Sequence, residues 1–402
     1  MELIERKSYT DRILHSLGKG LIIALTGQRR VGKSSILKLL RNTLTQNNNN
    51  VIYINKDKDE FHSINDNKSF SKYVAQHLSN DKNNYLLVDE IQNIESFELT
   101  LRSLQADNEC DIVITGSNSK ILSSELSTYL AGRFVEIHIQ SLSYNEFLSF
   151  QNIEDSQESI ISYLDLGGLP QLRTIGLNDI DFIDDYLQDV RNTVVLKDII
   201  ERYKIRNITL LNNLIEFISD NIGKPISATN IARYLKSQRI DTTAYGVLNY
   251  INYLCSSFII NRVKRYDIHG KRLFESNEKY YFEDLGIRNS IMKSHHHVGD
   301  IEKLIENAIY LHLRNMGYVV YVGQLRNTEI DFIAQKRNRT IYIQATYLLA
   351  SQETIEREFG NLKLIKDNHP KYVVSLDNLF EQTNDNGIIH INLRKFLQLS
   401  DL

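Results

Sequence analysis

The chain has 402 residues, of which 42% are hydrophobic and 24% are charged, a composition typical of two or three globular domains. Its formal net charge of −3 excludes a general electrostatic attraction to nucleic acid or to an anionic membrane, so such binding would have to come from local patches. The two cysteines, Cys110 and Cys255, fit no metal or disulfide spacing and favour a reducing compartment. Because the first residues are charged and no apolar run approaches the ~20 residues of a membrane span, we expect a cytoplasmic protein without a membrane partner.

Short apolar runs alternate with helical patterns over the first 154 residues. The runs in which we expect strands are 21–27, 51–55, 85–90, 111–117 and 134–139. Strands that alternate with helices indicate βαβ units and a parallel sheet. We therefore expect an α/β domain over residues 1–154, followed by a helical connector or lid over 155–206, where the pattern becomes helical.

The stretch GQRRVGKS, Gly27 to Ser34, matches the phosphate-loop (Walker A) pattern Gly-x4-Gly-Lys-Ser/Thr. An apolar strand precedes it and an amphipathic helix follows it, so backbone N–H groups and the helix N-terminus would face a phosphate. We predict that Lys33 contacts the β- and γ-phosphates of ATP and that Ser34 is a ligand of Mg²⁺. The predicted nucleotide-binding residues are Gly27, Gln28, Arg29, Arg30, Val31, Gly32, Lys33, Ser34, Ser35, Asp89, Ser117 and Asn118.

The strand YLLVDE would supply the acidic half of such a site (Walker B). It ends in Asp89, which we expect to hold Mg²⁺ through water at the carboxyl edge of the sheet. Glu90 follows directly, and we predict that it polarises the attacking water as general base. The alternative is that both are ordinary hydrophilic residues that close a strand.

Two further features follow along the chain. Ser117 and Asn118 come after the strand DIVITGSNS, where they would either contact the γ-phosphate or the attacking water or form an ordinary turn. Arg133, in YLAGRF, is predicted to neutralise charge on the transferred phosphoryl group, in its own chain or from a neighbouring subunit of a homo-oligomer.

Taken in order, GQRRVGKSSIL, LLVDEIQN, ITGSNSKIL and LAGRF resemble the AAA-type ATPases that are widespread in bacteria and archaea. Downstream, LGGLPQL, VVLKDIIERYKI, KYYFEDLGIRN, LIENAIYLHLRNMGY, EIDFIA and YIQATYLL resemble the C-terminal region usually fused to that ATPase. The resemblance covers nearly the whole chain. It implies ATP binding and hydrolysis, a winged helix, and a C-terminal domain similar to restriction-endonuclease-like folds.

Residues 207–297 have the order of a winged-helix domain. Two short helices, which we expect Ser227 and Thr242 to cap, precede a β-ribbon that turns near His269 and Gly270. A basic cluster lies on this ribbon: Arg262, Lys264, Arg265, Lys271 and Arg272. Either these residues contact DNA phosphates, or the module packs on the ATPase domain and responds to nucleotide.

The region 298–402 is predicted to be a separate α/β domain. Glu306, on an expected helix over 301–314, and Asp331, on an expected strand, could together hold one divalent cation. The next strand carries Gln344 and Thr346, where the related nucleases have an acid and a lysine. We therefore expect a degenerate nuclease-like site and a restriction-endonuclease-like domain without nuclease activity. His295–His297 are interpreted as part of a linker and not as a metal site.

The pattern as a whole predicts an ATP-binding protein, a Mg²⁺-dependent ATPase whose nucleotide state controls the winged-helix and C-terminal domains. One alternative is a nucleotide-switched regulator that binds DNA or a protein partner and turns over slowly. The other alternative is an ATP-dependent nuclease.

Overall fold

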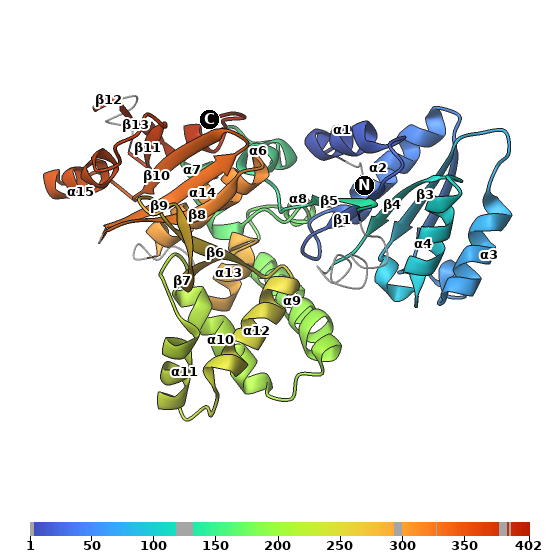
Figure 1. Ribbon diagram of the computed structural model, residues 1–402, viewed down its shortest axis with the longest axis horizontal. Coiled ribbons are helices and arrows are strands. Elements are labelled where there is room, and N and C mark those ends of the chain that lie inside the picture. Colours follow the sequence, from blue (N-terminus) through green and yellow to red (C-terminus); the bar gives the residue numbers. More distant parts are fainter. Residues whose placement is uncertain (1–3, 118–131, 293–299, 327, 378–383, 386) are drawn as a thin grey trace. The chain divides into compact units, whose positions relative to one another are not determined.

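The computed structural model describes residues 4–117, 132–292, 300–326, 328–377, 384–385 and 387–402 (Figure 1). The chain divides into an N-terminal unit, residues 1–139 with 256–258, and a C-terminal unit, residues 140–255 with 259–402. The first division therefore falls before the expected boundary at 154. The boundaries expected at 206 and 297 lie inside the C-terminal unit and stay predictions. Among the described residues, no helix is long and apolar enough to cross a membrane.

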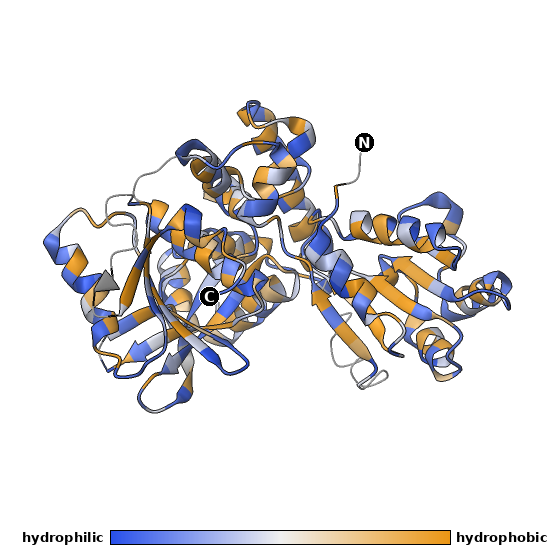
Figure 2. Cartoon of the chain, turned by 90° about the horizontal axis from the view of Figure 1, so that it is seen from above, coloured by the Kyte–Doolittle hydropathy of each residue, from blue (hydrophilic) through white to orange (hydrophobic). Residues whose placement is uncertain are grey.

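A five-stranded parallel sheet forms the centre of the N-terminal unit, in the order β2-β3-β4-β1-β5. Its strands are β1 (Ile22–Thr26), β2 (Asn50–Asn55), β3 (Asn84–Asp89), β4 (Asp111–Thr115) and β5 (Phe134–His138). They are hydrophobic along most of their length (Figure 2), as expected for a parallel sheet buried on both faces. The parallel α/β sheet predicted for this region is thus confirmed.

Helices cover both faces of this sheet. The helices are α1 (Lys7–Ser16), α2 (Lys33–Gln46), α3 (Asn67–His77) and α4 (Phe97–Ala106), with single 3₁₀ turns at Asp59–Phe61 and Ile91–Asn93. Helices α3 and α4 contribute Phe70, Val74, Leu101 and Leu104 to one buried cluster with the strands. Alternate strand positions face the other way, where α2 contacts β2 and β3. This three-layer arrangement places every strand's carboxyl end at one edge.

The C-terminal unit begins with helices. In chain order these are α6 (Tyr144–Gln151), α7 (Gln157–Leu166), α8 (Leu172–Ile175), α9 (Ile180–Thr193), a π-helical turn (Val194–Glu201), α10 (Ile208–Asp220), α11 (Ala228–Ser237) and α12 (Ala244–Ser256). Ser227 caps α11 as expected, since its hydroxyl accepts the Asn230 N–H at 3.2 Å. The cap of α12 is Thr243 and not Thr242, because the Thr243 hydroxyl accepts the Gly246 N–H at 3.0 Å.

One eight-stranded sheet runs through the rest of the C-terminal unit, in the order β12-β13-β11-β10-β9-β8-β6-β7. Its strands are β6 (Ile260–Asp267), β7 (Arg272–Phe282), β8 (Val319–Leu325), β9 (Thr328–Lys336), β10 (Arg339–Ala345), β11 (Lys371–Ser375), β12 (Asn384–Asp385) and β13 (Ile388–Asn392). Its helices are α13 (Leu285–Met292), α14 (Ile301–Asn315), α15 (Gln352–Lys363) and α16 (Leu393–Phe396). The predicted ribbon is β6–β7, and β6 pairs in parallel with β8. The ribbon therefore belongs to the same sheet as the C-terminal strands.

Two of the quoted sequence motifs, LGGLPQL and KYYFEDLGIRN, meet in the core of this unit. The buried carboxylate of Asp284 accepts the N–H groups of Gly168 at 2.9 Å and Ile287 at 3.0 Å. A Cβ atom added to Gly286 would lie 2.1 Å from the carbonyl oxygen of Leu166, so only glycine fits there. These motifs are explained by packing.

Candidate nucleotide-binding site

The phosphate loop connects the carboxyl end of β1 to the first residue of α2, as the sequence predicted. Gly27 and Gly32 have φ angles of 138° and 100°, which side-chain-bearing residues rarely adopt. A Cβ atom on Gly27 would lie 2.1 Å from the carbonyl oxygen of Ile139. The backbone of Gly27 therefore passes directly against the end of β5.

Lys33 is buried at the base of this loop, where its ammonium donates hydrogen bonds of 2.8 Å to the carbonyl oxygens of Gly27 and Gln28. The residue before the helix is Gly32, which has no side chain, so the N-cap position makes no side-chain bond to the N–H groups of the first turn of α2. Gln28 is 2% exposed, and neither polar atom of its side-chain amide has a hydrogen-bond partner among the residues that the structure describes. Uncapped N–H groups, a buried ammonium and an unpaired amide fit an anionic phosphate chain.

The remaining loop residues differ in exposure. Arg30 is exposed and has a φ of 69°, Arg29 and Ser35 are partly exposed, and Val31 is buried. The Val31 carbonyl oxygen accepts a 3.1 Å hydrogen bond from Arg6, which is itself buried. Sequence reasoning did not identify Arg6, because a charged residue before the first helix carries no motif.

Asp89 lies at the carboxyl end of β3 and is fully buried. It accepts hydrogen bonds from the Thr115 hydroxyl at 2.6 Å and from the Asn55 amide at 3.2 Å, and the Ser34 hydroxyl lies close enough to influence its pKa. Burial raises the pKa of Asp89, and the hydroxyl groups of Thr115 and Ser34 oppose this rise. The structure thus brings together Ser34 and Asp89, the two residues predicted to hold Mg²⁺, and their oxygen atoms suit that hard cation.

Glu90 follows Asp89 in a left-handed conformation with φ of 56°. Its N–H donates to the Thr115 hydroxyl at 3.0 Å, and its carboxylate accepts hydrogen bonds from the Ser117 hydroxyl at 3.4 Å and from the Gln92 amide. Ser117 therefore lies beside Glu90 in this site. Asn118 lies outside the described residues.

Arg133 lies at the opposite edge of the sheet. Its carbonyl oxygen accepts the Ile22 N–H at 2.9 Å, so it precedes β5 at the amino end of β1. The phosphate loop begins after Thr26, about 13 Å further along β1 at ~3.3 Å per residue. The prediction that Arg133 acts in the site of its own chain is therefore wrong, because parallel strands place the residue before β5 at the far edge. A role from a neighbouring subunit stays a prediction.

Sequence reasoning also missed Asn55 and Thr115. Each is the last residue of a buried parallel strand, as Asp89 is. Polar residues in that position were a usable signal, because the carboxyl ends of parallel strands meet at the ligand-binding edge.

Comparison with known proteins agrees with this geometry. Residues 19–148 match the family described as AAA domain, and residues 157–296 match a domain of unknown function (DUF8612). An uncharacterized protein of Haemophilus influenzae is 32% identical over 399 residues, which cover 96% of each chain. An uncharacterized protein of Methanocaldococcus jannaschii is 29% identical over 86% of this chain and 79% of its own.

The chain belongs to the family of this Haemophilus protein, and its N-terminal unit is an AAA-type P-loop ATPase domain. The fold of the AAA domain is also found in a Walker-type ATPase of Pyrococcus abyssi. That structure has a TM-score of 0.51 and 15% identity, over 72% of this chain and 95% of the other. The winged-helix and restriction-endonuclease-like assignments of the C-terminal unit stay predictions.

The residues of the degenerate nuclease-like site lie in the C-terminal unit, outside the AAA domain. Glu306 and Asp331 share a partner that sequence reasoning missed, the ammonium of Lys279 on β7. Gln344 accepts the Asp331 N–H at 2.8 Å and donates to the Glu358 carboxylate at 2.8 Å. Thr346 is buried directly after β10. Within the described part of the chain, no group of three or more His, Cys, Asp or Glu residues is arranged to hold a metal ion.

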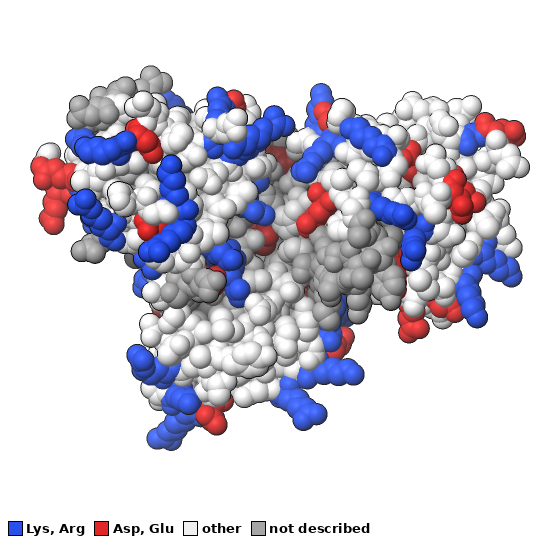
Figure 3. Space-filling model, viewed as in Figure 1, with Lys and Arg blue, Asp and Glu red and all other residues white. Residues whose placement is uncertain are grey.

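The basic ribbon is partly neutralised by neighbouring carboxylates. Arg262 pairs with Glu278 at 3.1 Å, and Arg272 pairs with Asp267 at 3.6 Å. Arg265 hydrogen-bonds Gln324 and lies over the ring of Phe274, whereas Lys264 and Lys271 are exposed. On the face shown in Figure 3, basic side chains are scattered and interspersed with acidic ones.

Proposed function

We propose that the AAA domain is a Mg²⁺-dependent ATPase. The observation that carries this proposal is the convergence of Lys33, Ser34, Asp89 and Glu90 at one edge of the sheet, where the Thr115 hydroxyl connects Asp89 to Glu90. Lys33 exchanges its two carbonyl partners for phosphate oxygens when ATP binds. Ser34 and Asp89 hold the Mg²⁺, which supplies charge neutralisation on the phosphates.

In this proposal Glu90 polarises the attacking water. Ser117 and Gln92 hold its carboxylate, and Thr115 connects its backbone to Asp89. A carboxylate with these partners is positioned before substrate arrives, which lowers the cost of reaching the transition state.

Steady-state phosphate release and binding of a fluorescent ATP analogue test these roles. We expect Lys33→Ala to lose both binding and turnover. We expect Glu90→Gln to bind the analogue but to lose turnover by about a hundredfold or more, as for removal of a general base. Glu95→Gln changes an exposed carboxylate nearby and serves as the control. Unchanged turnover in Lys33→Ala and Glu90→Gln would refute the assignment.

We further propose that the bound nucleotide controls the C-terminal unit. This proposal is supported by the contact between the phosphate loop and the residue at which the chain leaves the AAA domain. The Ile139 N–H donates to the Thr26 carbonyl oxygen at 2.7 Å, and Gly27 packs against the Ile139 carbonyl oxygen. A change in the loop on nucleotide binding therefore acts directly on the start of the connection.

The second candidate is a slow, nucleotide-switched regulator that binds DNA. The exposed Lys264 and Lys271, for which no ion pair is found among the described side chains, favour it, because phosphate contacts need accessible cations. Two measurements distinguish the ATPase from this regulator. One is DNA binding with and without ATP at two salt concentrations, and the other is ATP turnover in the presence of DNA. The regulator predicts ATP-dependent binding that weakens with salt and is lost in the double variant Lys264→Ala, Lys271→Ala, with slow turnover unchanged by DNA.

A further inference from the structure

Three carboxylates of the C-terminal unit converge on one buried ammonium group. Lys279 Nζ lies 2.8 Å from Glu306 Oε1, 2.8 Å from Glu329 Oε1 and 3.7 Å from Asp331 Oδ1. The lysine comes from β7, whereas the acids come from α14 and β9. The Lys279 side chain is 1% exposed, so its charge depends on these partners and not on water.

Protein groups besides Lys279 also contact the carboxylates of Glu306 and Asp331. Glu306 Oε1 accepts the Tyr281 hydroxyl as well as the ammonium. The second oxygen of Glu306 faces Gly223, where an added Cβ atom would lie 2.6 Å away. Asp331 Oδ2 accepts the Ala345 N–H at 2.9 Å. Both oxygens of Asp331 and Oε1 of Glu306 thus already have protein partners, and Gly223 crowds the remaining oxygen of Glu306.

The electrostatics of the cluster support a permanent positive charge at its centre. Burial lowers the pKa of Lys279, but Glu306, Asp331 and Glu329 raise it more, so the net shift is upward. Burial and the charge of Glu306 raise the pKa of Asp331, while Lys279 opposes this rise. With three carboxylates within 3.7 Å and its side chain 1% exposed, the ammonium occupies the cation position of the cluster, where a second cation would be repelled.

Gln344, on the neighbouring strand β10, has no polar group available to bind a metal ion. Its amide oxygen accepts the Asp331 N–H and its amide nitrogen donates to Glu358, so both of its polar groups already have protein partners. Glu358 is further paired with Arg357 at 2.7 Å. The acid that would complete a two-carboxylate metal site is thus replaced by an amide that connects β9 to α15.

We propose that the Lys279 ammonium is the resident cation of the Glu306–Glu329–Asp331 cluster, so that this cluster binds no divalent metal and cleaves no phosphodiester bond. Its role is to fasten the ribbon to the C-terminal strands. Asn307 extends this connection, since its side chain bonds both the N–H and the carbonyl oxygen of Phe282, at 2.8 and 2.9 Å.

The test compares nucleotide-free Ser34→Ala protein with the double variant Ser34→Ala, Lys279→Met, because Ser34→Ala removes the Mg²⁺ ligand proposed in the AAA domain. Thermal unfolding is measured in EDTA and in millimolar Mn²⁺, and bound Mn²⁺ is counted by electron paramagnetic resonance. We expect no Mn²⁺ response while Lys279 is present. Without it, we expect a lower melting temperature in EDTA, partial recovery in Mn²⁺, and about one bound ion that Asp331→Asn removes.

Two metal-binding results would overturn the proposal. One is a Mn²⁺ ion that binds while Lys279 is present and is lost on Asp331→Asn. The other is the absence of any Mn²⁺ response after Lys279→Met, which would mean that the cluster is no cation site. If the Lys279→Met protein does not fold, the Mn²⁺ titration with Lys279 intact decides alone. DNA cleavage in Mn²⁺ by the wild type, abolished by Asp331→Asn, would contradict the proposal as well.

Discussion

Thr115 connects the two acidic residues of the nucleotide site through one hydroxyl group. It donates to Asp89 Oδ1 and accepts the N–H of Glu90, and it is fully buried. A hydroxyl with both bonds made fixes the relative position of the metal ligand and the general base. Its contribution is therefore geometric, and it can be removed without changing any charge.

We predict that Thr115→Val lowers ATP turnover about tenfold, which corresponds to ~1.4 kcal/mol. The buried Asp89 oxygen and Glu90 N–H that lose their partner also lower the free energy of unfolding by roughly 1–3 kcal/mol. Turnover assays and urea denaturation measure the two effects. Thr100→Val is the matched control, because Thr100 is a buried threonine on α4 that bonds the Asn67 carbonyl oxygen. A similar loss of turnover in both variants would show that the effect is only structural.

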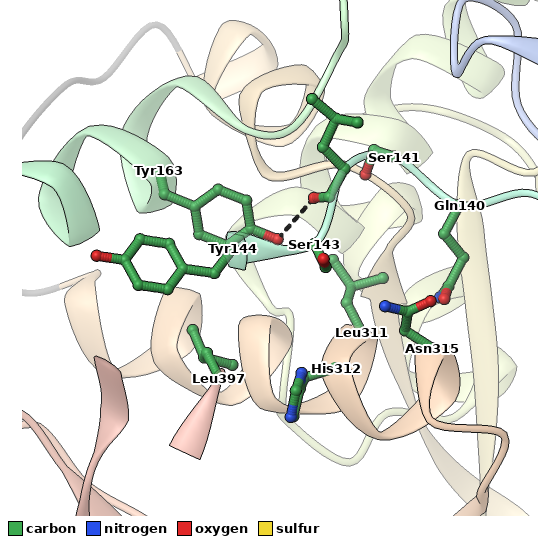
Figure 4. A pocket seen from close by; sticks show the side chains of 10 residues that line it. Gln140, Ser141, Ser143, Tyr144, Tyr163, Leu311, His312, Asn315 and Leu397 are labelled. Carbon is green, nitrogen blue, oxygen red and sulfur yellow. Dashed lines mark hydrogen bonds between the residues drawn. The ribbon is translucent and has the colours of Figure 1, made fainter. Parts of the chain in front are cut away.

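His312 in the C-terminal unit is a buried group that makes stability depend on pH. It lines a small cavity with Tyr144, Tyr163 and Leu397, where the Tyr163 hydroxyl donates to the Leu142 carbonyl oxygen at 3.1 Å (Figure 4). Burial lowers the pKa of His312 from 6.5 to about 4, although backbone carbonyl groups favour its charged form. Between about pH 4 and pH 6.5 the folded protein therefore keeps this imidazole neutral, while the unfolded chain binds a proton.

We predict that the free energy of unfolding is unaffected by His312 above its unfolded pKa of 6.5 and falls as the pH drops toward 4. The loss approaches about 3 kcal/mol at the lower end, at 1.36 kcal/mol per pKa unit. His312→Gln should flatten this acid limb in denaturation curves recorded across the pH range. His269→Gln, in the exposed turn of the ribbon, should leave it unchanged. Equal slopes for wild type and His312→Gln would contradict the prediction.

At the scale of elements, the position of a predicted site residue depends on whether it lies at the carboxyl end or at the amino end of its strand. The phosphate loop follows β1 and Asp89 ends β3, and the structure places both at the carboxyl edge of the sheet. Arg133 precedes a strand, so the same rule places it at the other edge. The direction of β5 could have been inferred from the sequence, since a parallel sheet was already expected there. The motif alone does not contain this information.

The meeting of Gly167–Gly168, directly after α7, with Asp284–Gly286, at the start of α13, is a second element-scale feature. Asp284 is fully buried and accepts two backbone N–H groups. We predict that Asp284→Ala lowers the free energy of unfolding by roughly 2–6 kcal/mol, because each unpaired buried N–H costs about 1–3 kcal/mol. Chemical denaturation measures this loss. Asp284→Asn keeps one acceptor oxygen and should lie between the wild type and the alanine variant, and equal stability of all three would contradict this account.

Over the whole molecule, the features predicted from the sequence are those with a local pattern, and the feature that depends on long-range contacts was missed. The five parallel strands and the phosphate loop were predicted because each has a local signature in the sequence. The Lys279 cluster was not, because its lysine and its acids lie in regions assigned to different domains. The pairing of β6 with β8 and the bonds between Asn307 and Phe282 bring them together, and no local pattern specifies either.

The proposed control of the C-terminal unit by nucleotide gives a prediction for the whole chain. We expect a non-hydrolysable ATP analogue to slow amide hydrogen exchange over residues 134–142, because Thr26 and Gly27 contact Ile139. Mass spectrometry measures this protection. Lys33→Ala should abolish it, whereas Glu90→Gln should retain it. Protection that is confined to the phosphate loop would contradict the proposed control and leave the ATPase proposal intact.

The shared sheet of the C-terminal unit also limits how this protein can recombine. A crossover near residue 298 would take β6 and β7 from one parent and β8 from another, so the β6–β8 pairing and the Lys279 cluster would be of mixed origin. A crossover near Gln140 would leave both sheets whole. Chimeras with the Haemophilus relative should therefore fold when joined near 140 and lose stability when joined near 298. The ribbon and the C-terminal strands would therefore have to come from the same parent, because they form one sheet.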